Sequence, residues 1–271
     1  MRPLTATALL EAWERGRTVS PLHRALLLLA LAWPEWSQEQ LAQLPLGRRD
    51  ALLFRLREGI FGPHLASVVD CPACGERLEF VLDSAQLAPD AGLPQLSDAP
   101  PQPITPQSIT VETRLDDRAL AITLRPPTSA DLAGVLQDAD PEADPQAARE
   151  ALLRRCLLDV QPLDVQPLDE TASPVELPQP LPEPLVAALS QALEAGDPLA
   201  DLRLDLTCPA CEHAWQAPFD ILAFFWQEID DWAWRTLREV HLLARSYGWS
   251  EQAILSMSAW RRRIYLEMVQ A

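Results

Sequence analysis

The identical tetrapeptides Cys71-Pro72-Ala73-Cys74 and Cys208-Pro209-Ala210-Cys211 decide how the rest of this chain is organised. Zinc prefers four thiolates at the corners of a tetrahedron, and each Cys-x-x-Cys turn supplies two sulfurs at a suitable spacing. One such pair is a weak signal, whereas two pairs with the same sequence are a strong one. We therefore predict that Cys71, Cys74, Cys208 and Cys211 bind one structural Zn²⁺ ion, which ties together two distant parts of the chain.

The residues next to the cysteines favour a tight turn at each pair. Proline after the first cysteine stiffens the turn, and Gly75 after the second allows a positive φ that points backbone amides at sulfur. In the second tetrapeptide the matching residue is Glu212. A side chain in that conformation costs about 1 kcal/mol, but this departure removes no metal ligand.

Other interpretations of the cysteines and their neighbours fit the sequence less well than a structural zinc site. Buried or redox-active thiols without metal are disfavoured because both pairs carry the same sequence. A catalytic ion is disfavoured because four thiolates leave no open position for water. His213 could replace one ligand, but we interpret it as a surface histidine. Cys156 lies among leucines and is predicted to be a core residue.

Composition and charge exclude several classes of protein. The chain has 271 residues, of which 22 are basic and 39 acidic, and a net charge of -17. This charge repels phosphate backbones, so we expect no nucleic-acid partner. No apolar run approaches the roughly 18 residues of a membrane span, and the start of the chain lacks a signal-peptide profile. We therefore expect a cytoplasmic protein with no membrane partner.

Hydrophobic periodicity predicts an α+β fold, with mainly helical N- and C-terminal segments around a split four-cysteine zinc ribbon and a small antiparallel β element. The predicted segments are a helical segment (1–66), the first zinc knuckle and strand (67–85), a Pro-rich linker (86–107), an inserted hairpin-plus-helices region (108–200) with a Pro-rich loop (159–184), a strand and the second zinc knuckle (201–218), and an aromatic helical segment (219–271).

Within these segments the pattern predicts individual elements. Helices are expected at 128–137, 146–158, 183–195 and 219–247, the last ended by Gly248. Two alternating runs on either side of Asp116-Asp117 predict a hairpin. Residues 159 to 169 repeat Asp-Val-Gln-Pro-Leu in tandem, and we expect such a repeat only in an exposed loop.

Catalytic motifs are missing from the sequence. His23, His64 and His241 have no recognisable partner spacing, and no phosphate-binding glycine loop or nucleophile elbow is present. We therefore expect that the chain is not an enzyme.

The C-terminal part carries the most distinctive sequence words of the chain. They are Phe219-Asp220-Ile221, Phe225-Trp226-Gln227-Glu228-Ile229-Asp230, Arg238-Glu239-Val240-His241, Tyr247-Gly248-Trp249, Trp260-Arg261-Arg262-Arg263 and Tyr265-Leu266-Glu267. With the paired cysteine knuckles, these words resemble the baseplate hub assembly chaperone family of T-even-type phages, in the variant found in phage-tail-like contractile injection system clusters. The resemblance covers most of the chain outside the two Pro-rich stretches.

The resemblance implies a function that composition alone does not. It implies a non-enzymatic assembly factor whose partner is a hub or spike subunit of a contractile tail baseplate. Two alternatives remain: a permanent structural baseplate subunit, and a zinc-ribbon nucleic-acid-binding protein, which the acidic composition disfavours.

Aromatic residues near the C-terminus predict where a partner binds. Trp226 and Ile229 lie in the apolar band of the 219–247 helix and are expected in the core. Exposed aromatics beside arginines are typical of docking surfaces. The residues predicted to bind the partner are Trp249, Trp260, Arg261, Arg262 and Tyr265.

Overall fold

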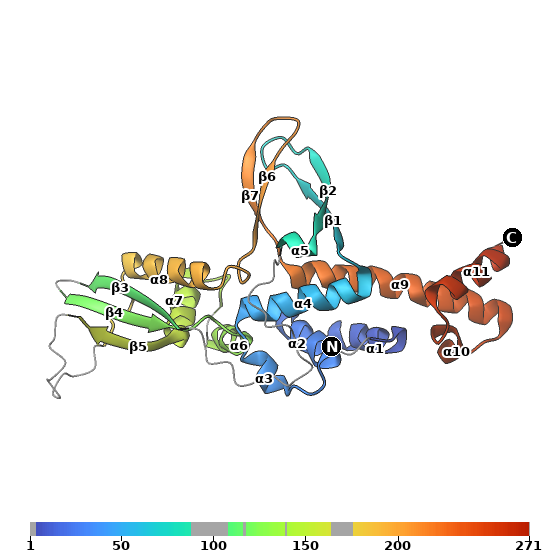
Figure 1. Cartoon of the computed structure of the whole chain (residues 1–271), viewed down its shortest axis with the longest axis horizontal. Coiled ribbons are helices and arrows are strands. Elements are labelled where there is room, and N and C mark those ends of the chain that lie inside the picture. Colours follow the sequence, from blue (N-terminus) through green and yellow to red (C-terminus); the bar gives the residue numbers. More distant parts are fainter. Residues whose placement is uncertain (1–3, 88–107, 116–117, 139, 164–175, 271) are drawn as a thin grey trace.

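The computed structural model describes residues 4–87, 108–115, 118–138, 140–163 and 176–270. The fold is α+β, with many helices and small antiparallel sheets, as the sequence predicts. Figure 1 shows three parts, which we name the helical body, the paired hairpins that project from it, and an inserted module at one end. The inserted module lies in the sequence between the two hairpins.

The helical body combines the two ends of the chain. Its helices are α1 (Ala6–Gly16), α2 (Pro21–Ala32), α3 (Gln38–Ala42), α4 (Leu46–Phe61), α9 (Ile221–Tyr247), α10 (Glu251–Leu255) and α11 (Ala259–Gln270). Gly248 ends α9 with a φ of 70°, a conformation that glycine adopts without steric cost. The N-terminal helices and α9 pack against each other although they are far apart in the sequence.

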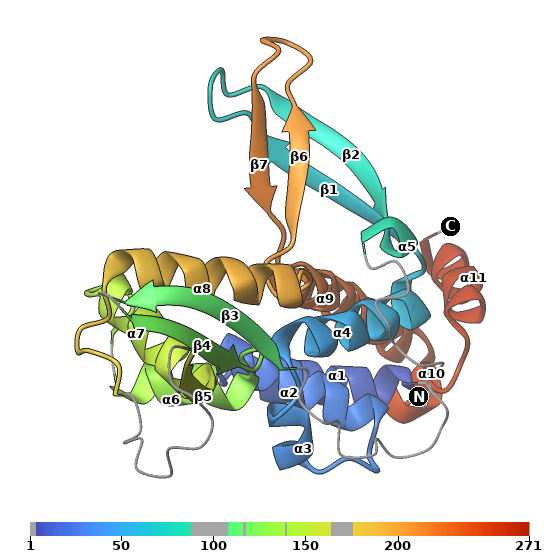
Figure 2. The ribbon, with the colours of Figure 1, turned by 60° about the vertical axis from the view of Figure 1, so that its left-hand side comes forward.

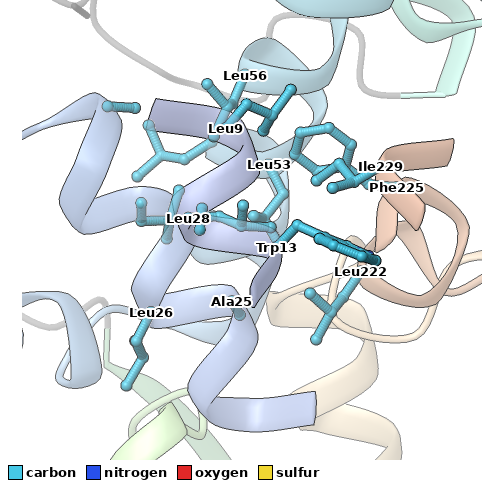
Figure 3. Packing of buried hydrophobic residues seen from close by; sticks show 14 of the residues in the cluster. Leu9, Trp13, Ala25, Leu26, Leu28, Leu53, Leu56, Leu222, Phe225 and Ile229 are labelled. Atoms are coloured by element: carbon cyan, nitrogen blue, oxygen red, sulfur yellow. The ribbon is translucent and has the colours of Figure 1, made fainter. Parts of the chain in front are cut away.

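The core of the helical body forms where the apolar band of α9 meets α1, α2 and α4. Phe225 and Ile229 of α9 are fully buried among leucines of the N-terminal helices, as Figure 3 shows. Trp226 is half-buried, packs against this core and lies under the guanidinium of Arg24 at 4.7 Å. The predicted core position of Ile229 is therefore confirmed, and Trp226 lies at the edge of the same core.

The paired hairpins stand on the helical body, side by side in both ribbon views (Figures 1 and 2). One contains β1 (His64–Asp70) and β2 (Arg77–Asp83), and the other β6 (Arg203–Thr207) and β7 (Ala214–Pro218). The predicted helical segment to residue 66 is too long, because α4 ends at Phe61 and β1 begins at His64. The sequence pattern predicts neither β1 nor β7. Apolar residues lie on both faces of β1, so its sequence does not alternate clearly, and β7 is too short for a clear pattern.

The inserted module has its own small core. Its sheet has the order β3 (Ile109–Leu115), β4 (Arg118–Leu124) and β5 (Leu157–Pro162), with antiparallel pairs. Helices α6 (Ser129–Asp138), α7 (Pro145–Cys156) and α8 (Glu183–Gly196) accompany the sheet. Cys156 is fully buried among leucines of β4, α7 and α8, which confirms its predicted core position.

The predicted Pro-rich loop at 159–184 is wrong at both ends. Helix α7 stops at Cys156, and the first copy of the tandem repeat belongs to β5, where Val160 pairs with Ile122. Proline is tolerated at the end of an edge strand, which explains how Pro162 fits. Glu183 already belongs to α8. The second copy, the Asp116-Asp117 turn and residues 88–107 of the predicted linker lie outside the described residues, while residues 86 and 87 end the short helix α5 (Ser84–Leu87).

Polar contacts join the inserted module to the start of α4. This helix begins after Pro45 without a side-chain cap. Instead, the Leu46 amide donates to the Pro127 carbonyl at 2.9 Å, and the Gly47 amide donates to the Asp197 carboxylate at 2.9 Å. A Cβ at position 47 would overlap the Asp197 carboxylate and displace the group that accepts this hydrogen bond. The module thus satisfies two of the free amides at the N-terminus of α4.

A buried carboxylate holds the start of α6, and it makes the stability of the inserted module depend on pH. Asp131 accepts two hydrogen bonds from Arg125, at 2.6 and 2.8 Å, and others from the amide and hydroxyl of Thr128. Burial alone would raise the pKa of Asp131, but the bonds from Arg125 and Thr128 lower it below its ordinary value. The bonds therefore stabilise the fold above about pH 4, and this contribution is lost as pH falls through the lowered pKa.

We expect Asp131→Asn to lower the free energy of unfolding at pH 7 by about 1 to 3 kcal/mol, because charge-assisted bonds are lost. The difference from wild type should shrink below about pH 4. Urea unfolding at pH 7 and pH 3.5 measures both values. Asp138→Asn is a matched control, since its ion pair with Arg155 is exposed and should contribute less than about 1 kcal/mol. An equal loss for Asp131→Asn at both pH values would contradict the prediction.

Candidate metal centre

The four predicted ligands lie at the tips of the paired hairpins, at matching positions. Cys71 follows β1 and Cys208 follows β6, and each is buried. The amide of Cys71 donates to the Glu76 carbonyl at 2.8 Å, and the amide of Cys208 donates to the His213 carbonyl at 2.9 Å. The two knuckles therefore have the same backbone hydrogen bonds, and each presents its sulfurs in the same way.

The sulfurs of the two knuckles meet between the tips. The Sγ atoms of Cys71 and Cys211 are 3.7 Å apart, and those of Cys74 and Cys208 are 3.6 Å apart. All four sulfurs lie within 4.8 Å of one another. A tetrahedral ion with metal–sulfur bonds of about 2.3 Å places its ligands about 3.8 Å apart. The spacing therefore fits four thiolates around one metal ion, while a disulfide requires about 2.05 Å.

Backbone hydrogen bonds favour a thiolate at one of these sulfurs, and its neighbours oppose further ionisation. Burial alone would raise the pKa of Cys71, but bonds from the amides of Cys74 and Ala73 lower it to about 7. At Cys74, a bond from the Glu76 amide favours the thiolate, yet the neighbouring sulfurs raise the pKa to about 12. Four thiolates this close together need a cation to balance their charge.

The expected strain at Glu212 is present. Its φ is 60°, and that of Gly75 in the other knuckle is 76°. The amides of both residues donate at 2.9 Å to the carbonyl of the first cysteine of their knuckle. A Cβ at position 75 would meet open space, so the cost of a side chain comes from the backbone conformation alone.

These two positions give opposite predictions for two substitutions. We expect Glu212→Gly to raise the free energy of unfolding by about 1 kcal/mol, because it relieves the positive φ. Gly75→Ala should lower it by a similar amount. Thermal unfolding of both variants with metal bound measures the difference. A loss of stability in Glu212→Gly would show that the glutamate side chain stabilises the knuckle in another way.

His213 is an exposed residue beside the second knuckle. Its ring stacks on Trp215, with centroids 5.9 Å apart, and the group of four cysteines that could hold a metal ion does not include it. Within the described part of the chain, these cysteines are the only group of three or more histidines, cysteines and carboxylates arranged to hold a metal ion.

A buried arginine that the sequence analysis did not single out fixes the base of the hairpins. Arg57 of α4 is 1% exposed and donates to both carboxylate oxygens of Glu228 in α9, at 2.6 and 2.8 Å. It also donates to the carbonyl of Gly62 and, at 2.8 Å, to that of His64, where β1 begins. Arg57 therefore joins the start of one hairpin to the helix that follows the other. Because α4 also carries Arg48, Arg49 and Arg55, no local sequence signal singles out Arg57.

Of the five residues predicted to bind a partner, Arg262 is buried, while the other four are at least partly exposed. Trp249 stacks on Tyr247 with centroids 4.5 Å apart, and its ring also meets Tyr265 edge-on at 4.9 Å. Arg262 is only 5% exposed and donates to Glu239 at 3.0 Å. Trp260 and Arg261, by contrast, are exposed. The predicted role of Arg262 is therefore corrected: its guanidinium joins α11 to α9.

Two further findings concern more than the metal centre. Among the described residues, no helix combines the length and the apolar character that crossing a membrane requires. Comparison of the chain with protein-family models, with curated proteins and with solved structures finds no match.

Proposed function

We propose that this chain is a cytoplasmic, non-enzymatic assembly factor for the baseplate hub of a contractile phage tail-like injection system, stabilised by one structural Zn²⁺ ion. The observation that carries the proposal is the four-sulfur group that joins the paired hairpins. Four thiolates fill the coordination shell of zinc and leave no position for water or substrate, which is typical of structural ions. The ion itself would therefore supply no reaction centre, and the proposal assigns the function to the surfaces of the chain.

The choice of zinc follows from the chemistry of the ligands. Thiolates are soft ligands, and a tetrahedral set of four selects zinc or an iron–sulfur cluster. The sulfurs stand 3.6 and 3.7 Å apart across the two knuckles, which suits a single ion. Paired Cys-x-x-Cys knuckles on short hairpins are typical of zinc ribbons.

The proposed partner is a hub or spike subunit of the baseplate, on the basis of the C-terminal sequence words. Several of their residues have structural roles: Phe225 and Ile229 form the core, Glu228 binds Arg57, and Glu239 binds Arg262. A nucleic-acid partner is disfavoured because the net charge is -17 and Arg262, within the one compact basic run, is buried. The function is therefore assigned to protein–protein binding.

A pull-down with the tagged chain tests this proposal. The bait is expressed with the rest of the injection-system cluster, particles are purified in parallel, and zinc is quantified in the bait. We expect a hub or spike subunit to bind the bait, one zinc ion per chain, and little of the chain in finished particles. A fixed copy number in the particles would identify a permanent baseplate subunit, and binding to neither subunit would refute the proposed partner.

A further inference from the structure

Helix α11 carries an exposed apolar stripe along one face. Trp260, Ile264 and Met268 follow one another at intervals of four residues, so their side chains share one side of the helix. Trp260 is 71% exposed and Met268 is 62% exposed, while Ile264 is half-buried. A tryptophan and a methionine exposed to this extent on one helix are unusual for a surface that meets only water.

The opposite face of α11 holds the helix on the body. Arg262 donates to Glu239 of α9 and to the Met257 carbonyl at 2.8 Å. Tyr265 and Leu266 pack against the core of the helical body, whereas the stripe residues do not belong to that core. The stripe residues therefore remain exposed after α11 has made its contacts within the fold, and α9 holds the helix in place beneath them.

Positive charge flanks the stripe on both sides. Arg261 and Arg263 are exposed, and neither forms an ion pair within the described residues. Arg261 also makes a cation–π contact with the ring of Tyr265, at 5.8 Å. Glu267 is also exposed, one turn after Arg263, so two arginines and one glutamate leave a net positive charge beside the stripe in a chain whose net charge is -17.

We propose that Trp260, Ile264 and Met268 are the anchors by which α11 binds an apolar groove with an acidic rim on the partner protein. Helix-in-groove recognition uses apolar anchors at this spacing, and tryptophan and arginine dominate the energy of such interfaces. The acidic rim follows from charge complementarity with Arg261 and Arg263. This inference rests on the proposed function and specifies the chemistry of its partner.

The position of α11 is consistent with this role. It lies at the end of the body opposite to the inserted module, close to the C-terminus (Figure 1). A partner in this position is well separated from the inserted module. The site also differs from the surface predicted from sequence, because Trp249, Arg262 and Tyr265 make contacts within the fold, while Ile264, Met268 and Arg263 take their place.

Matched variants of the full-length, metal-loaded protein test the inference. The apolar test variant is Trp260→Ser with Met268→Ser, and its control is Trp234→Ser, an exposed tryptophan on α9. The charge test variant is Arg261→Glu with Arg263→Glu, and its control is Arg238→Glu, also on α9. Affinity for the purified hub and spike subunits is measured by calorimetry at 50 and 300 mM salt, and circular dichroism confirms that each variant is folded.

We expect the apolar variant to weaken binding at least about 100-fold, and the charge variant to weaken it at least about 10-fold at low salt. The controls should stay within about threefold of wild type. Unchanged affinity in both test variants, with wild type binding normally, would overturn the α11 site and leave the proposed function standing. A wild-type chain that binds neither subunit would instead refute the proposed function.

Two other occupants of the stripe give different results. A second copy of the chain would appear in analytical ultracentrifugation as a dimer that the apolar variant abolishes. An anionic membrane would appear as cosedimentation with vesicles of phosphatidylcholine and phosphatidylglycerol that the same variant abolishes. Either result, without loss of affinity for the baseplate subunits, would overturn the inference.

Discussion

Cys208→Ser is expected to abolish stoichiometric metal binding and to lower the melting temperature by more than about 10 °C. Cys208 is fully buried, and its sulfur lies 3.6 Å from that of Cys74. Structural zinc in a four-ligand site contributes on the order of 10 kcal/mol to folding, and a serine hydroxyl does not replace a thiolate ligand. Because an ion bound by these cysteines would join hairpins from distant segments, its loss should free both hairpins together.

Cys156→Ala is the matched control for this experiment. Cys156 is equally buried, but it lies in the core of the inserted module. Burial raises the pKa of its thiol to about 12, so it stays a neutral core group. Mass spectrometry for metal content and calorimetry for unfolding should show one ion per chain in wild type and Cys156→Ala, and none in Cys208→Ser. A Cys208→Ser protein that keeps one ion and melts like wild type would contradict the four-cysteine site.

Chelation of the wild-type protein should reproduce the effect of Cys208→Ser on unfolding. If the chelated protein instead melts as the loaded protein does, the metal adds nothing to stability. The two experiments are independent, because one removes a ligand and the other removes the ion. If chelation and Cys208→Ser lower the melting temperature by similar amounts, the loss of stability comes from the loss of the metal ion.

The grouping of the four cysteines could be predicted from the sequence because its signal is local. Each knuckle carries its own spacing, proline and turn residue, and the two copies confirm each other without any knowledge of the fold. The positive φ at Glu212 was predictable in the same way, from its alignment with Gly75. Short-range signals of this kind survive because tertiary contacts do not override them.

The missed features depend on contacts between distant segments. Strand β5 lies in a proline-rich stretch and is a strand because it pairs with β4. The burial of Arg262 depends on Glu239, which is on another helix. Hydrophobic periodicity identifies the apolar face of a helix, but it does not predict which polar side chain is buried by an ion pair with another helix. The buried face of α9 was predictable, because its apolar band is long and regular and lies within one helix.

The second large effect concerns Arg57, which fixes the base of the hairpins. We expect Arg57→Met to lower the free energy of unfolding by about 3 to 5 kcal/mol and the melting temperature by roughly 10 °C. Methionine fills a similar volume, so the loss reports the missing hydrogen bonds. Without the guanidinium, the carboxylate of Glu228 and the carbonyls of Gly62 and His64 lose their donor. Urea and thermal unfolding of the metal-loaded protein measure the change.

Arg55→Met is the matched control, because Arg55 lies on the same helix, is half-buried and makes no hydrogen bond or ion pair within the described residues. Its loss should stay below about 1 kcal/mol. A double-mutant cycle with Glu228→Gln isolates the pair, and we expect the double variant to lose less than the sum of the single variants. Additive losses would show that Arg57 acts only through the two carbonyls.

Metal content separates the two ways in which the hairpins are held. The cysteines join the hairpins at their tips, while Arg57 joins their bases through α4 and α9. Arg57→Met should therefore keep one metal ion per chain while its melting temperature falls. Cys208→Ser, by contrast, should lose the metal ion and also melt at a lower temperature. A metal-free Arg57→Met protein would mean that the knuckles meet only when the bases of the hairpins are fixed. Arg57 would then be necessary for metal binding. Retention of the ion would show that the tips assemble through their own turns, and that Arg57 stabilises the body beneath them.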